Sequence, residues 1–208
     1  MGHVLNSLGL VYQRIGDAGK AHRCHNQTWE TARRMGNPGL EADSLKSLGA
    51  VRLAQGRAGE AVGLLERALT VAVGIGQRDI EDYVRRTLGR AHGRSGEADM
   101  AMEHLRSAPF TARDTGNREL EAETLNVCGE VLLAGDAKLA LENYAGALAF
   151  ARDTHNRWQE ARSLDGLADR CCGRGAALPM ARTLAPPESR AVTWAFVARP
   201  KGFEPLTF

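Results

Sequence analysis

The chain repeats itself with a period of 40 residues, and this periodicity constrains the fold more than any other feature of the sequence. The segment VLNSLGLVYQRIGDAGKAHRCHNQTW, which begins at Val4, returns in altered form as SLKSLGAVRLAQGRAGEAVGLLERAL at Ser44. Four columns recur in this register: a Leu-Gly or Cys-Gly pair (Leu8-Gly9, Leu48-Gly49, Leu88-Gly89, Cys128-Gly129), a turn glycine (Gly16, Gly56, Gly96, Gly135) and two alanines (Ala21, Ala61, Ala101, Ala140; Ala32, Ala72, Ala112, Ala151). The fourth unit lacks one residue before its turn, and a fifth begins at Ala161 and then loses the pattern.

Each unit contains two helical patterns separated by the turn glycine. In the second unit the small and apolar residues after the turn follow the spacing of one helix face: Ala61, Leu64, Leu65, Ala68, Leu69 and Ala72. No segment alternates with period two over a useful length, so the sequence predicts an all-α protein.

Glycine and alanine at fixed positions allow two helix backbones to approach closely. One helical hairpin cannot bury its apolar stripe alone, so the units must stack into a solenoid. The alternative is a long coiled coil, but glycines about every twenty residues would each cost about 1 kcal/mol inside such a helix.

These residues resemble the tetratricopeptide repeat (TPR), in which Leu-Gly is followed by a bulky residue such as Tyr12, a turn glycine and an alanine. The resemblance covers about residues 2–173. It implies a right-handed superhelix of antiparallel helix pairs, with four units and a partial fifth. We therefore predict a TPR array over residues 1–174 and an irregular tail over residues 175–208.

The unit is longer than the usual TPR period of about 34 residues. The longer variety is similar to the repeats of LGN/Pins-type adaptors and to the C-terminal repeats of bacterial SARP/AfsR-type transcriptional regulators. The segment NRWQEARSLDGLADRCCGRG most resembles the regulators. Two features depart from the pattern: Arg52 and His92 stand where Tyr12 does, and Pro109 replaces Leu69. Proline inside a helix predicts a kink near Ala108-Pro109.

Composition excludes several classes of function. With 27 basic and 25 acidic residues, the chain has no general attraction to nucleic acid or to an anionic membrane. Its four cysteines do not form a disulfide framework, and no apolar run is long enough to span a membrane. We expect reduced thiols and a cytoplasmic location.

Neither end shows the polar cap that a solenoid needs. Met1 aligns with Glu41 in the first turn of a repeat, and Pro179, Pro186 and Pro187 stop helix formation near the other end. We therefore interpret the chain as a fragment of a longer regulator, whose uncapped ends could associate with a second copy.

We find no catalytic, cofactor or metal motif. His22 and His25 flank Cys24, but His25 falls in the packing column of Leu65 and no further ligand pair completes a zinc site. Glutamates recur in register at the predicted helix starts, where they favour the helix dipole: Glu41, Glu81, Glu121 and Glu160. The sequence therefore predicts no enzyme, no metal and no cofactor.

The working surface that the resemblance implies is the concave groove lined by the first helices. One column that we expect to be exposed there comprises Asn6, Lys46, Arg86, Asn126 and Asp165, and the neighbouring column includes Arg90 and Glu130. Arg86 and Arg90 lie one helical turn apart and share a face, with Lys46 in the equivalent place one unit earlier. An ordinary solvated face of mixed charge is the alternative interpretation.

The predicted function is therefore a non-catalytic protein-protein interaction module, the TPR region of a bacterial transcriptional regulator. Its groove would hold a peptide segment of a partner, and an acidic segment suits the arginines. The alternative is a free-standing LGN-type scaffold. The acidic residues beyond the basic patch argue against direct binding of nucleic acid.

Overall fold

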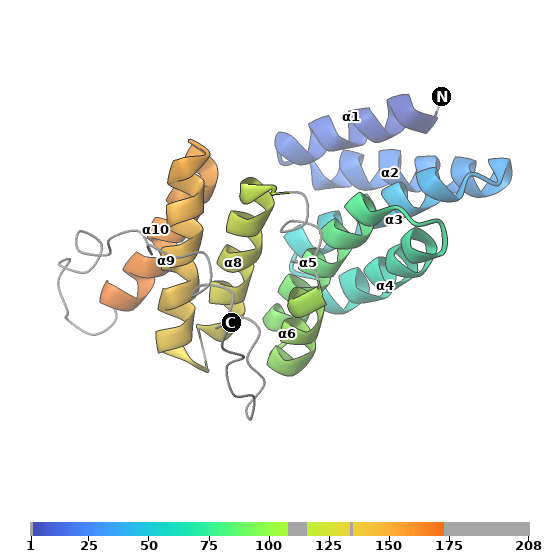
Figure 1. The fold of residues 1–208 in the computed structure, drawn as a ribbon. Coiled ribbons are helices and arrows are strands. Elements are labelled where there is room, and N and C mark those ends of the chain that lie inside the picture. The colour runs from blue at the N-terminus through green and yellow to red at the C-terminus, as the bar shows by residue number, and fades with distance from the viewer. Residues whose placement is uncertain (1, 108–115, 134, 173–208) are drawn as a thin grey trace. The chain divides into compact units, whose positions relative to one another are not determined.

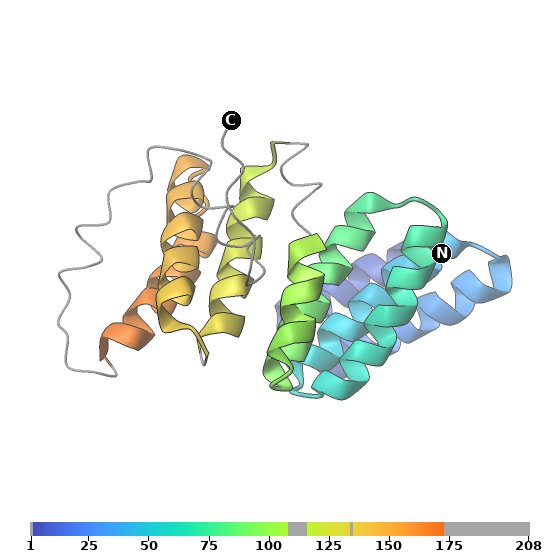
Figure 2. The same ribbon diagram turned by 60° about the horizontal axis from the view of Figure 1, so that its bottom comes forward.

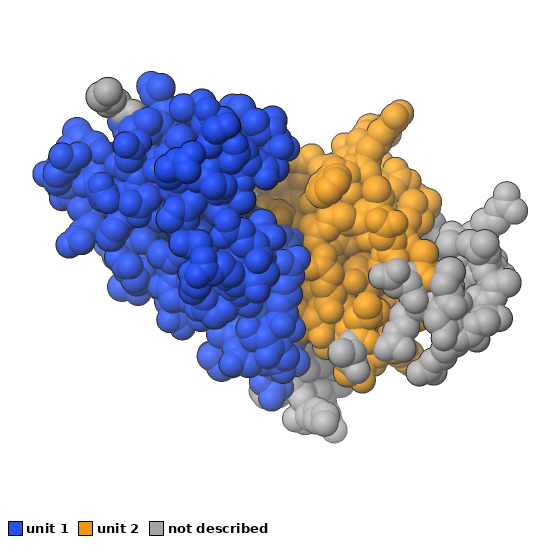
Figure 3. All heavy atoms as spheres, turned by 180° about the vertical axis from the view of Figure 1, so that it is seen from behind, with its two compact units in different colours: residues 1–111 blue, residues 112–208 orange. Residues whose placement is uncertain are grey.

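The computed structural model describes residues 2–107, 116–133 and 135–172, which form helices joined by short turns, with no strand among them (Figure 1). The chain divides into two compact units, residues 1–111 and 112–208, which Figure 3 colours separately. The described helices are α1 (Gly2–Arg14), α2 (Ala18–Met35), α3 (Pro38–Ala54), α4 (Ala58–Gly74), α5 (Arg78–Arg94), α6 (Ala98–Ser107), α8 (Arg118–Leu132), α9 (Ala137–Asp153) and α10 (Arg157–Cys172). The predicted all-α class is confirmed. No helix in the described part of the chain has both the length and the apolar character to cross a membrane.

The first unit consists of three helical hairpins. Helices α1 and α2 pack together, as do α3 with α4 and α5 with α6, and α2 and α4 each also pack on the first helix of the next hairpin (Figures 1 and 2). Helix α3 in addition contacts both α1 and α5. The first helices of successive repeats are therefore neighbours, which places equivalent residues of successive repeats along one face.

The second unit contains the fourth hairpin and the start of a fifth. Helix α9 packs between α8 and α10, and α8 also contacts α10. Tyr144 and Leu148 of α9 form a small core with Leu167 of α10. Helix α10 thus occupies the place of a first helix, as the partial fifth repeat predicted.

Side-chain caps start several of the helices. The carboxylate or amide oxygens of Asp17, Asn37, Asn117 and Asp136 each accept a hydrogen bond of 3.0–3.2 Å from the backbone N–H three residues later. The recurring glutamates lie in the first turns of α3, α5, α8 and α10, so their predicted structural position is confirmed: Glu41, Glu81, Glu121 and Glu160.

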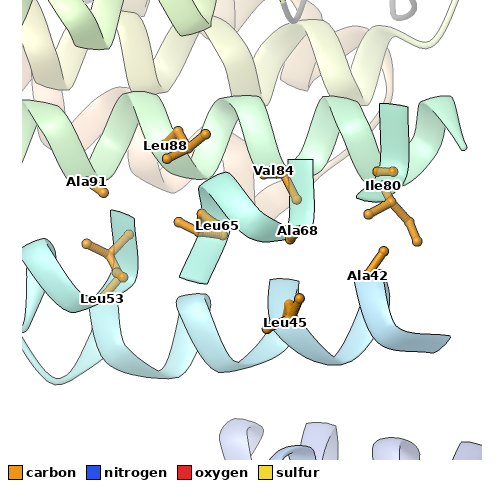
Figure 4. Packing of buried hydrophobic residues seen from close by; sticks show 11 residues of the cluster. Ala42, Leu45, Leu53, Leu65, Ala68, Ile80, Val84, Leu88 and Ala91 are labelled. Atoms are coloured by element: carbon orange, nitrogen blue, oxygen red, sulfur yellow. The ribbon is translucent and has the colours of Figure 1, made fainter. Parts of the chain in front are cut away.

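The core depends on glycines in the first helices that accept large side chains from the second helices. A Cβ added at Gly49 would lie 2.6 Å from Cγ of Leu65, and one at Gly89 would lie 2.5 Å from Cγ of Leu105. Both leucines are fully buried. Figure 4 shows Leu65 between Leu53 of the preceding helix and residues of α5. The two backbones can approach this closely only because glycine has no side chain.

Left-handed backbone conformations recur at the turns. Among the described residues, six glycines have a φ between 60° and 82°: Gly16, Gly36, Gly56, Gly76, Gly96 and Gly116. His155 stands in the column of Gly36, Gly76 and Gly116 and adopts the same conformation, with φ 54°. The turn geometry is therefore kept in the fourth repeat without glycine.

Two predictions fall outside the described residues. Helix α6 is described to Ser107, so the kink predicted at Ala108-Pro109 lies beyond it. Helix α10 ends at Cys172, and the predicted tail over residues 175–208 lies beyond that residue. Both stay predictions.

The contact between Gly49 and Leu65 predicts a pair of coupled substitutions. We expect Gly49→Ala to lower the free energy of unfolding by roughly 1–3 kcal/mol, because the new methyl group overlaps Leu65. Leu65→Ala should cost roughly 2–5 kcal/mol. The double variant should cost less than the sum, because the methyl group then occupies part of the vacated space. Urea denaturation measures all three, and additive losses would contradict the contact.

The turn at Gly76 predicts a purely conformational effect. Its φ is 69° and an added Cβ would meet no atom within 4 Å, so Gly76→Ala should destabilise the fold by about 1–2 kcal/mol through backbone strain alone. The matched control is Gly63→Ala, which also meets no atom within 4 Å but lies inside α4. It should stabilise the fold by roughly 0.4–1 kcal/mol. Thermal melts that move in the same direction for both variants would refute this explanation.

Candidate functional site

The residues predicted to line a groove all lie on first helices. Asn6 is on α1, Lys46 on α3, Arg86 and Arg90 on α5, Asn126 and Glu130 on α8, and Asp165 on α10. The first four belong to the first unit and the other three to the second. We therefore describe the two units separately.

A chain of polar contacts crosses the first unit. Nδ1 of His25 on α2 lies 2.8 Å from Oδ1 of Asn6, and the Asn6 amide donates a hydrogen bond to the Asp43 carboxylate. Asp43 also forms an ion pair with Lys46, one turn further along α3. Asn6 and Lys46 are thus joined through an acidic residue, and the first two repeats share one polar network.

The network continues into the third repeat through an aromatic ring. Nζ of Lys46 lies 5.1 Å from the ring centroid of Tyr83 on α5, and Cζ of Arg86 lies 5.9 Å from the same centroid. Both distances suit cation–π attraction. Arg90 follows one turn later on α5. We call Asp43, Lys46, Tyr83, Arg86 and Arg90 the first-helix stripe.

The expected exposure of the column is wrong at three positions. Asn6, Arg86 and Asn126 retain only 6%, 4% and 0% of their accessible surface. Each lies on a first helix that packs against a neighbouring first helix as well as against second helices, and this double packing covers its side chain. Lys46 keeps 21% of its side-chain surface, and Arg90 is half-buried.

In the second unit Asn126 links two helices. Its Nδ2 donates to Oε1 of Gln159 at 3.0 Å, and its Oδ1 accepts from Oγ of Ser163 at 2.9 Å, both on α10. A fully buried amide with both ends satisfied fixes the packing of α8 on α10. Glu130 is exposed and pairs with Arg162, and Asp165 is exposed. The exposed residues of the two columns in this unit are therefore acidic.

Sequence reasoning missed Asp43 and Tyr83 as members of the site. They occupy the same repeat column, 40 residues apart and one turn before Lys46 and Arg86. The signal was therefore present, because side chains three residues apart on a helix are neighbours.

His25 is a core residue. It is fully buried in the position that Leu65 and Leu105 hold in later repeats, and a Cβ added at Gly9 would lie 2.5 Å from its ring. Its Nδ1 faces the Asn6 carbonyl oxygen, while Nε2 has no hydrogen-bond partner among the described residues. Burial lowers the pKa of His25 to about 4, because a charged ring would be desolvated there.

The neighbouring histidine is engaged separately. Nε2 of His22 lies 2.8 Å from a guanidinium nitrogen of Arg52, and burial lowers the pKa of His22 too. Within the described ranges no three His, Cys, Asp or Glu side chains come together as a metal site would require.

The buried imidazole predicts a pH-dependent stability. The unfolded chain protonates His25 near pH 6.5 and the folded chain only near pH 4, so stability is complete above pH 6.5 and falls between these values. The contribution is about 1.4 kcal/mol per pH unit. His25→Leu should flatten this slope in urea denaturation at pH 7, 6 and 5. The control is His155→Asn, which replaces an exposed histidine. Equal slopes for both variants would contradict the assignment.

No protein-family model matches the chain, and no curated protein matches its sequence. Solved structures with a similar fold do exist. One is a Podosopora anserina protein described as a kinesin light chain with nearly identical TPR-like repeats, with a TM-score of 0.66 and 20% identity over 88% of this chain and 90% of that chain. A variant of that protein gives a TM-score of 0.67 and 19% identity over 93% of each chain.

The BtubC (BKLC) protein from P. vanneervenii is also similar, with a TM-score of 0.70 and 17% identity over 98% of this chain and 82% of that chain. At these identities the likeness concerns the fold. The chain is therefore a TPR-like helical repeat solenoid, in agreement with the resemblance in its sequence.

Proposed function

We propose that the chain is a non-catalytic protein-binding module and that the first-helix stripe of its first unit binds an acidic segment of a partner protein. The observation that carries this proposal is the arrangement of Lys46 and Arg86 around the ring of Tyr83. Lys46 and Tyr83 are partly exposed and Arg86 is buried behind them, and tyrosine and arginine are enriched among the residues that dominate binding energy at protein interfaces.

The charge of the stripe favours carboxylates. The stripe contains three cations, Lys46, Arg86 and Arg90. Two acidic residues lie one turn before them: Asp43 before Lys46 and Asp82 before Arg86. Lys46 is paired with Asp43, so a partner carboxylate would share an existing ion pair rather than meet a bare cation. Arg90 is the half-buried arginine of the stripe, and a guanidinium can hold a carboxylate through two parallel hydrogen bonds.

The second unit carries acidic residues in these two neighbouring columns. Glu130 and Asp165 are exposed there, and Asn126 is fully buried. Glu130 pairs with Arg162, and we propose that the contacts of an acidic segment are confined to α3 and α5. Asn126 then acts in packing rather than in binding.

A finer proposal concerns the protein's biological setting. The resemblance of NRWQEARSLDGLADRCCGRG to bacterial regulators supports a role as the interaction region of a cytoplasmic transcriptional regulator. A free-standing adaptor of the LGN type is the alternative. Gene context separates the two: an upstream segment that encodes a winged helix or a Walker motif supports the regulator, and its absence from the complete gene supports the adaptor.

Binding of an acidic peptide tests the proposed surface. The probe is a fluorescein-labelled decapeptide with five glutamates, measured by fluorescence anisotropy at low and high salt. We expect Lys46→Gln with Arg90→Gln to weaken binding at least tenfold, about 1.4 kcal/mol, because two cations of the stripe are lost. Arg86 is a less suitable target, since a side chain with 4% exposure cannot be replaced without affecting the fold.

The matched control removes two cations elsewhere. Arg23 on α2 and Arg106 on α6 are exposed, and Arg23→Gln with Arg106→Gln changes the net charge equally. Equal loss of affinity in both double variants would reduce the effect to overall charge and would overturn the stripe. Circular dichroism of both variants verifies that the helices are intact.

A further inference from the structure

The first unit also has a hollow that shares no residue with the first-helix stripe. It lies between α2 and α4, over residues of α3, and its volume is about 470 Å³. This size falls in the range of pockets that hold small ligands or the side chains of a bound peptide. Its lining is Trp29, Leu45, Leu48, Arg52, Leu64 and Arg67, together with His22, Asn26, Glu60 and Gly63.

Two departures from the repeat pattern shape this hollow. Trp29 stands in the column that contains Leu69, Pro109 and Leu148 in the other units. Gly63 stands in the column that contains the long side chains Arg23, Glu103 and Glu142. At this hollow, a large aromatic side chain forms one wall, and position 63 of the lining carries no side chain.

The fold itself does not require glycine at position 63. The residue lies inside α4, its φ is not in the left-handed region, and an added Cβ would meet no atom within 4 Å. This distinguishes it from Gly49, which is in close contact with Leu65. Glycine is among the poorest helix formers, so the space left open beside position 63 is not explained by helix stability.

The Trp29 wall is held in place and carries positive charge. Its indole Nε1 donates to Oε1 of Glu41 at 3.3 Å, and the guanidinium carbons of Arg67 and Arg33 lie 5.1 and 5.3 Å from its ring. Arg33 approaches Glu41 at 3.9 Å. Arg67 is exposed, and within the described part of the chain no carboxylate pairs with it.

Arg52 completes the lining in a different way. Its Nε lies 3.3 Å from Oε2 of Glu60, a carboxylate that also pairs with Arg57, and its guanidinium also contacts His22. Arg67, which is exposed and lies over the Trp29 ring, is available at this opening to receive a carboxylate from outside.

We propose that this hollow is a second docking site, which accepts a bulky apolar side chain of a partner protein against Trp29 and Leu64 and a neighbouring carboxylate of that partner on Arg67. Charge complementarity selects the occupant: an apolar residue next to aspartate or glutamate satisfies both the apolar wall and the Arg67 guanidinium. The site acts independently of the first-helix stripe.

The test follows the indole N–H signal of Trp29 by nuclear magnetic resonance in the full chain, assigned with Trp29→Leu. The probe is a synthetic nonapeptide of glycine and serine with one central phenylalanine between two aspartates. We expect a saturable shift of the Trp29 signal. Peptides with alanine in place of phenylalanine, or with lysines in place of the aspartates, should bind at least tenfold more weakly.

Variants at Gly63 test whether a side chain that fills the hollow prevents the peptide from binding. Gly63→Gln places a long neutral side chain over the opening and should weaken binding at least tenfold, while Gly63→Ala should bind like the unaltered chain. Arg67→Gln, which introduces the residue found at Gln27 in the same column, should remove the preference for aspartate over lysine. The helical content of each variant is verified by circular dichroism.

The outcomes distinguish this site from the stripe. Lys46→Gln with Arg90→Gln should leave the Trp29 titration unchanged, whatever its effect on the glutamate decapeptide. No saturable shift of Trp29, equal binding of the lysine peptide, or full binding by Gly63→Gln would each overturn the proposal. Loss of the Trp29 shift in the stripe variant would overturn the independence of the two surfaces.

Discussion

The close approach of first and second helices through a glycine is the contact on which the rest of the structure depends. Gly49 accepts Leu65 and Gly89 accepts Leu105 at distances that leave no space for a methyl group. Because the second and third hairpins close in the same way, they present similar surfaces to one another, and the hairpins of the first unit stack. In the fourth hairpin Tyr144 takes the place of these leucines. Its ring would also meet a Cβ added at Gly166 of α10.

Polar residues in one repeat column have two different roles, packing inside the fold and exposure at the surface. In the second unit Asn126 satisfies both ends of its amide inside the interface of α8 and α10. In the first unit Lys46 is partly exposed beside Tyr83. Which role a position takes depends on the neighbours it meets on the next first helix. The first helices therefore carry both buried polar side chains that link helices and charged side chains at the surface.

The period of 40 residues predicted the fold because it records packing that recurs. The column of Gly9 and Gly49 and the burial of Leu65 could both be inferred from the alignment of units. Burial of Asn6 could not, because it depends on Asp43 in the next repeat and on His25 behind it. Periodicity shows what the repeats have in common, and a site arises where one repeat differs.

The absence of a side chain at position 63 has a consequence for how such a protein can change over generations. A column whose residue meets no neighbour is released from the demands of the core, so it can be replaced without a compensating change elsewhere. Gly49 has no such freedom. A helical array of this kind therefore contains positions where single codon changes can alter partner binding without disturbing the packed core.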